Sequence, residues 1–148
     1  MGVPPPTPPS TPWPSPTYSA ACDDTLWSHV YHPSRLKVLE QCIRVTGVVE
    51  FTRDELDGDI HIGLRLDPAY ASLINPSNTQ YERGDLVVEI ICAHPPVQRD
   101  ALDACANYIS PIGQPDVGTH VRVVGAYVLD TVHGWNEIHP VTTLEAFP

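Results

Sequence analysis

The chain has 148 residues, a formal net charge of −10 at pH 7 and 17 prolines. Affinity for DNA and RNA depends mainly on neutralising phosphates, so a chain this acidic is not expected to bind nucleic acid nonspecifically. No apolar run in the sequence approaches the roughly 20 residues that a membrane-spanning helix needs. We therefore expect no membrane span.

Proline dominates the start of the chain, where eight of the first sixteen residues are Pro. Proline lacks the backbone N–H that helices and sheets use, and it favours extended polyproline II structure. We therefore predict an extended stalk over residues 1–21 and one folded domain over residues 22–148. The opening Met1-Gly-Val-Pro4 lacks the charged and apolar regions of a signal peptide.

Alternating hydrophobic residues predict two strands in the first half of the domain, over residues 38–52 and 59–67. A turn at 54–58 joins them, and a short helical turn is expected at 67–75. On the second strand, Asp59 and His61 should point outward because side chains alternate between the two faces. The residues of the first strand that share one face in this pattern are Ile43, Val45, Gly47, Val49 and Phe51.

The second half of the domain predicts three more strands, over residues 86–93, 120–130 and 136–144, with a turn at 131–135. Between the first two of these, Pro95-Pro96 ends a strand, and residues 97–108 predict a helix with a stripe of small and apolar residues. Three strands, a helix and two strands are typical of the OB fold, a five-stranded Greek-key barrel. We therefore predict a mainly β, OB-like barrel with one helix between strands three and four.

Four cysteines, Cys22, Cys42, Cys92 and Cys105, occur without any CxxC pair, so a zinc ribbon is not expected. Three disulfide connectivities are open. The short-range one, Cys22–Cys42 with Cys92–Cys105, would stabilise by about 3 kcal/mol for each loop in the chain-entropy model. Disulfides persist in oxidising compartments, which favours a secreted or envelope-exposed protein. Four buried free thiols in a cytosolic protein are the alternative.

Acids and histidines concentrate at two turns that are far apart in the sequence. The segment Asp57-Gly-Asp-Ile-His61 opens the second strand, and His133-Gly-Trp-Asn-Glu-Ile-His139 spans the last hairpin. In an OB fold the loops between strands one and two and between strands four and five flank the usual ligand-binding face. The barrel would therefore bring both segments to one rim.

The candidate metal ligands at this rim are Asp59, His61, His133, Glu137 and His139. Imidazoles with one or two carboxylates suit transition metals better than calcium, and zinc is the preferred candidate. Two other interpretations stay open. The face could bind a small polar ligand without metal, or the second segment could be a plain hairpin in which Gly134 supplies a positive-φ turn and Trp135 caps the barrel.

Three functions agree with this sequence. The first is a secreted, stalked binding module that holds a metal ion or a small polar ligand. The second is a metal-dependent hydrolase of the phosphodiesterase type, with Glu137 as the base that activates a metal-bound water. The third is an assembly subunit that associates with other copies through its proline-rich N-terminus. Nucleophilic catalysis is not supported, because no GxSxG motif occurs and the cysteines are expected to be structural. The sequence also has no glycine-rich phosphate loop or dinucleotide fingerprint.

Nearly the whole chain after residue 21 resembles a family of uncharacterised OB-like proteins of bacteria and archaea. The segments that carry the resemblance are the run from Pro33-Ser-Arg-Leu36 through Cys42, Asp57-Gly-Asp-Ile-His61, Leu86-Val-Val-Glu-Ile-Ile-Cys92, Tyr127-Val-Leu-Asp130 and the His-Gly-Trp-Asn-Glu-Ile-His-Pro-Val run over residues 133–141. The resemblance implies the same fold and a secreted or envelope-exposed location. It implies no activity.

Overall fold

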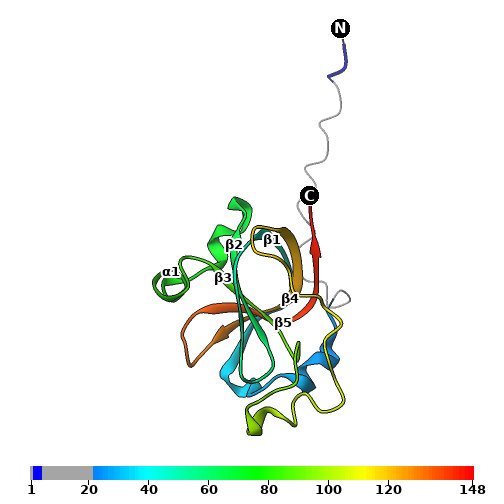
Figure 1. Ribbon diagram of the computed structural model, residues 1–148. Coiled ribbons are helices and arrows are strands. Elements are labelled where there is room, and N and C mark those ends of the chain that lie inside the picture. Colours follow the sequence, from blue (N-terminus) through cyan, green and yellow to red (C-terminus); the bar gives the residue numbers. More distant parts are fainter. Residues whose placement is uncertain (1, 5–21) are drawn as a thin grey trace.

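The computed structural model describes residues 2–4 and 22–148. The predicted stalk therefore lies almost entirely outside the described residues, as does association through it. The strands are β1 (Leu36–Asp54), β2 (Ile60–Leu66), β3 (Leu86–Ile90), β4 (His120–Asp130) and β5 (Asn136–Ala146). They form a closed barrel in the order β1-β2-β3-β5-β4 (Figure 1). The mainly β prediction is confirmed, and all five predicted strands are present.

The five strands pair into one mixed sheet. Four of the pairings are antiparallel, and the pairing of β3 with β5 is parallel. The inward side chains fill the barrel: Ile60, Ile62 and Leu64 of β2 pack with residues of the other four strands in one cluster. Fully burying a side chain of this size stabilises by roughly 1.5–3 kcal/mol. This alternation leaves Asp59 and His61 on the outer side of the sheet, as the sequence predicted.

The prediction of a helix over residues 97–108 is wrong. Within the described residues this segment contains the 3-10 turn η4 (Arg99–Ala101) followed by further turns. A regular helix rises about 1.5 Å per residue and would carry Cys105 far along its axis. Cys105 must instead return to Cys92, whose Cα lies 5.5 Å away across a disulfide. The predicted apolar stripe also stays partly in solvent, since Leu102 is 50% exposed.

The one α-helix among the described residues, α1 (Pro76–Tyr81), lies between β2 and β3 and outside the barrel (Figure 1). It follows the short helical turn expected at 67–75, which is the 3-10 helix η3 (Pro68–Leu73). Asn75 caps α1, because its side chain accepts a hydrogen bond from the backbone N–H of Asn78, and the Asn78 side chain accepts one from the Asn75 N–H. Two further 3-10 helices, η1 (Asp24–His29) and η2 (Pro33–Arg35), precede β1.

A β-bulge changes the predicted face of one residue in β1. The register shifts between Val49 and Phe51, so Phe51 lies opposite Gly63 on the outer side of the sheet instead of sharing the inward face of Val49. A Cβ atom at Gly63 would lie 2.1 Å from the Phe51 ring. Glycine at position 63 therefore leaves the space that the ring occupies, and the ring stacks on His61 with 5.9 Å between centroids.

All four cysteines form disulfides, Cys22–Cys42 and Cys92–Cys105. This is the short-range pairing. The second disulfide belongs to a small apolar cluster with Leu26, Val30 and Ile91, which attaches η1 to the end of β3. Among residues 2–4 and 22–148, no helix combines the length and hydrophobicity needed to cross a membrane.

We predict that His120, at the start of β4, makes a pH-dependent contribution to the stability of the folded protein. Its Nε2 lies 2.7 Å from Asp67 Oδ2, and this hydrogen bond raises the pKa of His120 above its ordinary value of 6.5. The stabilisation is therefore fully present below pH 6.5 and is lost as the pH rises through the raised pKa of the folded state. An NMR titration should give His120 a pKa above 6.5 that falls in Asp67→Asn. A His120 pKa that is the same in both proteins would contradict this.

Candidate functional site

A row of polar side chains crosses four neighbouring strands on the outer side of the barrel. Arg53 of β1 pairs in register with His61 of β2, and His61 pairs with Glu89 of β3. On β5, Glu137 pairs with Val87 of β3, which lies two residues before Glu89. Because side chains alternate along a strand, Glu137 and His139 share the outer side with Glu89. The register of the barrel thus brings the two sequence segments together.

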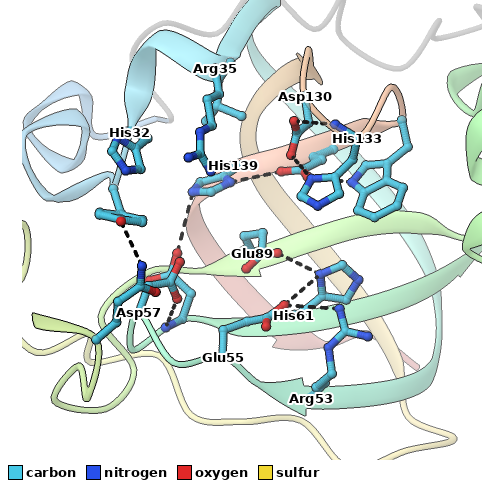
Figure 2. A pocket seen from close by; sticks show the side chains of 16 residues that line it. His32, Arg35, Arg53, Glu55, Asp57, His61, Glu89, Asp130, His133 and His139 are labelled. Carbon is cyan, nitrogen blue, oxygen red and sulfur yellow. Dashed lines mark hydrogen bonds and ion pairs between the residues drawn. The ribbon is translucent and has the colours of Figure 1, made fainter. Parts of the chain in front are cut away.

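This outer face is covered, although it points away from the core. The β1–β2 turn, the β4–β5 turn and the segment before β1 contribute side chains above it, and they enclose a cavity of about 360 Å³. Figure 2 shows the cavity, with His32, Arg35 and His133 on one side and Glu55 and His61 on the other. His61 is 2% exposed and His139 is 8% exposed. Polar groups this deeply buried must find partners within the protein.

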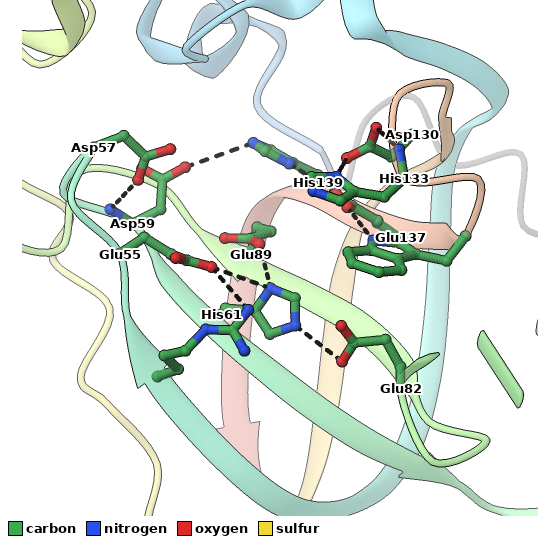
Figure 3. A network of polar contacts seen from close by, with 12 residues as sticks. Glu55, Asp57, Asp59, His61, Glu82, Glu89, Asp130, His133, Glu137 and His139 are labelled. Atoms are coloured by element: carbon green, nitrogen blue, oxygen red, sulfur yellow. Dashed lines mark hydrogen bonds and ion pairs between the residues drawn. The ribbon is translucent and has the colours of Figure 1, made fainter. Parts of the chain in front are cut away.

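His61 has carboxylate partners at both ring nitrogens (Figure 3). Its Nδ1 lies 2.8 Å from Glu89 Oε1 and its Nε2 lies 3.0 Å from Glu82 Oε2, while Glu55 Oε1 lies 3.5 Å from Nδ1. Burial lowers the pKa of His61, but the hydrogen bonds to Glu82 and Glu89 outweigh this effect and raise the pKa to about 10. His61 is therefore an imidazolium at neutral pH, held between carboxylates.

The position of Glu82 depends on α1, because Glu82 is the residue that ends this helix. Asn78 attaches the helix to the barrel. Its Nδ2 donates to the backbone carbonyls of Asp85 and Asn136, and its Oδ1 accepts from the Asn136 N–H. Asn78 has no exposed surface, so these bonds form away from water. They place the C-terminal end of α1 beside His61.

His139 is held differently from His61. Its Nδ1 lies 3.0 Å from Glu137 Oε2, and the other Glu137 oxygen accepts a hydrogen bond of 2.7 Å from the Trp135 indole. The Nε2 atom is buried and has no hydrogen-bond partner within the described part of the chain. It faces Asp59 Oδ2 at 3.7 Å, too far for a hydrogen bond (Figure 3). This pair leaves a gap between a ring nitrogen and a carboxylate.

Asp59 is fixed by two backbone contacts around this gap. Its Oδ1 accepts a hydrogen bond from the Cys92 N–H at 2.9 Å, and its own N–H donates to Asp57 Oδ1 at 3.0 Å. Burial raises the pKa of Asp59, although the nearby His139 lowers it in part. His139 itself has a pKa raised to about 9, because its contacts with Glu137 and other acids outweigh the effect of burial.

The cavity contains more carboxylates than imidazoles. Six acids lie around His61 and His139: Glu55, Asp57, Asp59, Glu82, Glu89 and Glu137. Burial raises the pKa of Asp57 and Glu89 as well as that of Asp59, because negative charges close together in a poorly solvated site favour the protonated form. The arrangement therefore favours any added positive charge.

All five residues predicted as metal ligands line this cavity, but they do not form one cluster. His133 pairs with Asp130 at 2.8 Å and stacks on Trp135 with 4.4 Å between ring centroids, so it belongs to the mouth. Glu137 has both carboxylate oxygens occupied by protein donors. The pair with an open position between its atoms is His139 with Asp59.

Sequence reasoning missed three acids of the site: Glu55, Glu82 and Glu89. Glu89 could have been found, because it alternates with the inward residues of β3 and so shares the outer side with His61. Glu82 follows a short helix in a polar segment, and nothing in the sequence around it indicates this contact. Atoms of Glu55, His61 and Glu89 lie within 4.8 Å of one another and form a second candidate group for an ion.

Comparison of the chain with protein-family models and with curated protein sequences finds no match. The function therefore has to be inferred from the geometry of the cavity.

Asn78→Ala should destabilise the protein by about 3 kcal/mol, because it leaves several buried backbone groups without partners. Urea denaturation measures the change. Gln114→Ala is the control, since Gln114 is exposed and its side chain bonds only Thr52 among the described residues; its effect should stay within about 0.5 kcal/mol. Equal stability of the two variants would show that Asn78 does not hold α1 in place.

Proposed function

We propose that the chain is an extracytoplasmic, OB-like binding module that holds one divalent transition-metal ion between His139 and Asp59, with zinc as the preferred metal. The observation that carries the proposal is the buried His139 Nε2, which has no hydrogen-bond partner in the described residues and faces a carboxylate oxygen. Because the pKa of His139 is raised to about 9, an ion would displace the Nε2 proton, and the Glu137 contact at Nδ1 would then leave the lone pair of the neutral ring on Nε2. Histidines that bind metals commonly have such a carboxylate on the other nitrogen.

The distance across the gap supports a shared ion. Zinc bonds to imidazole nitrogen and carboxylate oxygen are about 2.0–2.2 Å long, so two ligand atoms on a tetrahedral ion lie about 3.4 Å apart. The observed 3.7 Å between His139 Nε2 and Asp59 Oδ2 is close to this span. Asp57 also lines the cavity beside Asp59, but it does not form a group with Asp59 and His139 in which all ligand atoms lie within 4.8 Å. The protein would therefore supply two ligands, and the other positions on the ion would be open to water or a ligand.

The group of Glu55, His61 and Glu89 is less suited to the ion. Both rings have raised pKa values, so an ion would displace a proton from either one. Both His61 nitrogens also contact carboxylates, so at His61 the ion would have to break a hydrogen bond as well. The ring nitrogen of His139 that faces the gap has no such bond to lose. We therefore assign the ion to His139 and keep His61 as a charged partner of the surrounding acids.

Three features support the rest of the proposal. The strand order β1-β2-β3-β5-β4 with a parallel β3–β5 pair agrees with an OB-like barrel, and the cavity lies beside the two loops that flank the binding face of that fold. Two disulfides agree with an oxidising compartment. The hydrolase alternative is weaker, because both oxygens of Glu137 accept hydrogen bonds and leave no free position for a base.

The first test is metal content. We expect protein purified without a histidine tag to bind one zinc ion per chain, as measured by equilibrium dialysis and elemental analysis. His139→Ala and Asp59→Asn should lose this uptake, because each removes one ligand from the gap. His133→Ala is the matched control and should keep it, since His133 pairs with Asp130 at the mouth. No zinc uptake by the unaltered protein, or equal uptake by all variants, would contradict the proposal.

The second test concerns the orienting role of Glu137. Glu137→Gln should weaken zinc binding by about 10–100-fold, the loss that is usual when the hydrogen-bond partner of a metal-bound histidine is changed. Glu145→Gln, which alters an exposed ion pair with Arg122, should leave zinc affinity unchanged. Circular dichroism checks that both variants are folded. Zinc affinity in Glu137→Gln equal to that of the unaltered protein would show that Glu137 does not position the ring.

A further inference from the structure

The mouth of the cavity carries a cation that the acids below it do not neutralise. Arg35 is exposed and lines the cavity, and its side chain takes part in none of the ion pairs or hydrogen bonds found in the described part of the chain. Figure 2 shows its guanidinium directed toward the His139 ring. Arg53, on the same cavity, is by contrast paired with Glu55 at 3.2 Å. Arg35 therefore has all its side-chain donors available next to the gap.

The backbone fixes Arg35 in this place. Its carbonyl oxygen accepts hydrogen bonds of 2.8 Å from both the N–H and the hydroxyl of Thr131, which begins the β4–β5 turn. The next residue, Leu36, pairs with Asp130 at the start of the β1–β4 ladder. These contacts hold the base of the Arg35 side chain beside the turn that carries His133 and Trp135. The position of the Arg35 backbone is thus set by the barrel.

We propose that the cavity binds the phosphate group of a small molecule, with phosphate oxygens contacting Arg35 at the mouth and the metal ion below. This inference rests on the proposed function, because the acids of the cavity would repel an anion unless a cation neutralised them. A guanidinium presents a planar fork of N–H donors that matches phosphate oxygens, and a metal ion with an open position accepts another oxygen. Arg35 lines the same cavity as the His139–Asp59 pair that would hold the ion.

Size and surroundings favour a small ligand. A cavity of about 360 Å³ is at the lower end of the range for small-molecule sites, which is about 300–1,000 Å³. The stacked rings of His133 and Trp135 form a flat aromatic surface at the mouth, where an apolar or aromatic substituent of the phosphate ester could lie. A net charge of −10 disfavours a nucleic-acid polymer with many phosphates.

The probe is phenyl phosphate, measured by isothermal titration calorimetry on protein loaded with one zinc ion per chain and dialysed free of excess metal. We expect saturable binding that is weaker by about ten-fold or more in Arg35→Ala, because a charge-assisted bidentate contact is lost. Arg35→Lys should lose part of the affinity, since it keeps the charge without the fork. Arg122→Ala is the control, because it also removes one positive charge, but from an ion pair with Glu145. This variant should bind phenyl phosphate as tightly as the unaltered protein does.

Linkage separates this inference from the proposed function. If the phosphate contacts the ion, zinc raises phosphate affinity by some factor, and phosphate raises zinc affinity by the same factor. Arg35→Ala should keep zinc uptake while losing phosphate affinity. Zinc uptake without saturable phosphate binding, or phosphate binding unaffected by Arg35→Ala, overturns the inference and leaves the metal site standing. A protein that takes up no zinc overturns both, because phosphate binding is proposed through the ion.

Discussion

The outer face of this barrel depends on the contacts between two buried histidines and the carboxylates around them. A charged group that leaves water is costly unless a partner of opposite charge replaces the lost hydration. Here Glu82 and Glu89 flank His61, and Glu137 holds His139. These pairs offset the cost of burying the two rings under the loops. The same contacts fix both rings in single orientations, which a binding site needs.

The two histidines differ in how completely they are satisfied. His61 has a carboxylate at each nitrogen, whereas His139 has one partner and one buried nitrogen that faces Asp59 across a gap. The unfilled contact at His139 Nε2 is what distinguishes the two rings, because a buried ring nitrogen normally has a hydrogen-bond partner. The two rings therefore differ in their contacts although they lie in one cavity, and this difference is the basis on which we propose His139 as the ligand.

Much of this arrangement could be predicted from the sequence, because its signals were periodic or local. The alternation of apolar and polar residues along the second strand predicted that His61 points outward. In an OB-like barrel the β1–β2 and β4–β5 loops lie side by side, which predicted that Asp59 and His139 would approach each other. The helix over residues 97–108 was wrong, because a disulfide overrode the helical pattern. Glu82 could not be predicted, since its contact with His61 depends on where Asn78 attaches a short helix. Phe51 changed sides through a bulge that leaves no clear trace in the alternation.

The disulfide at the end of β3 has a consequence for Asp59. Cys92 forms this bond with Cys105, and the backbone N–H of the same Cys92 donates to Asp59 Oδ1. Oxidation of the two thiols thus secures the strand end from which the carboxylate is held. A chain with both thiols reduced would lack this covalent anchor beside the group that holds the Asp59 carboxylate.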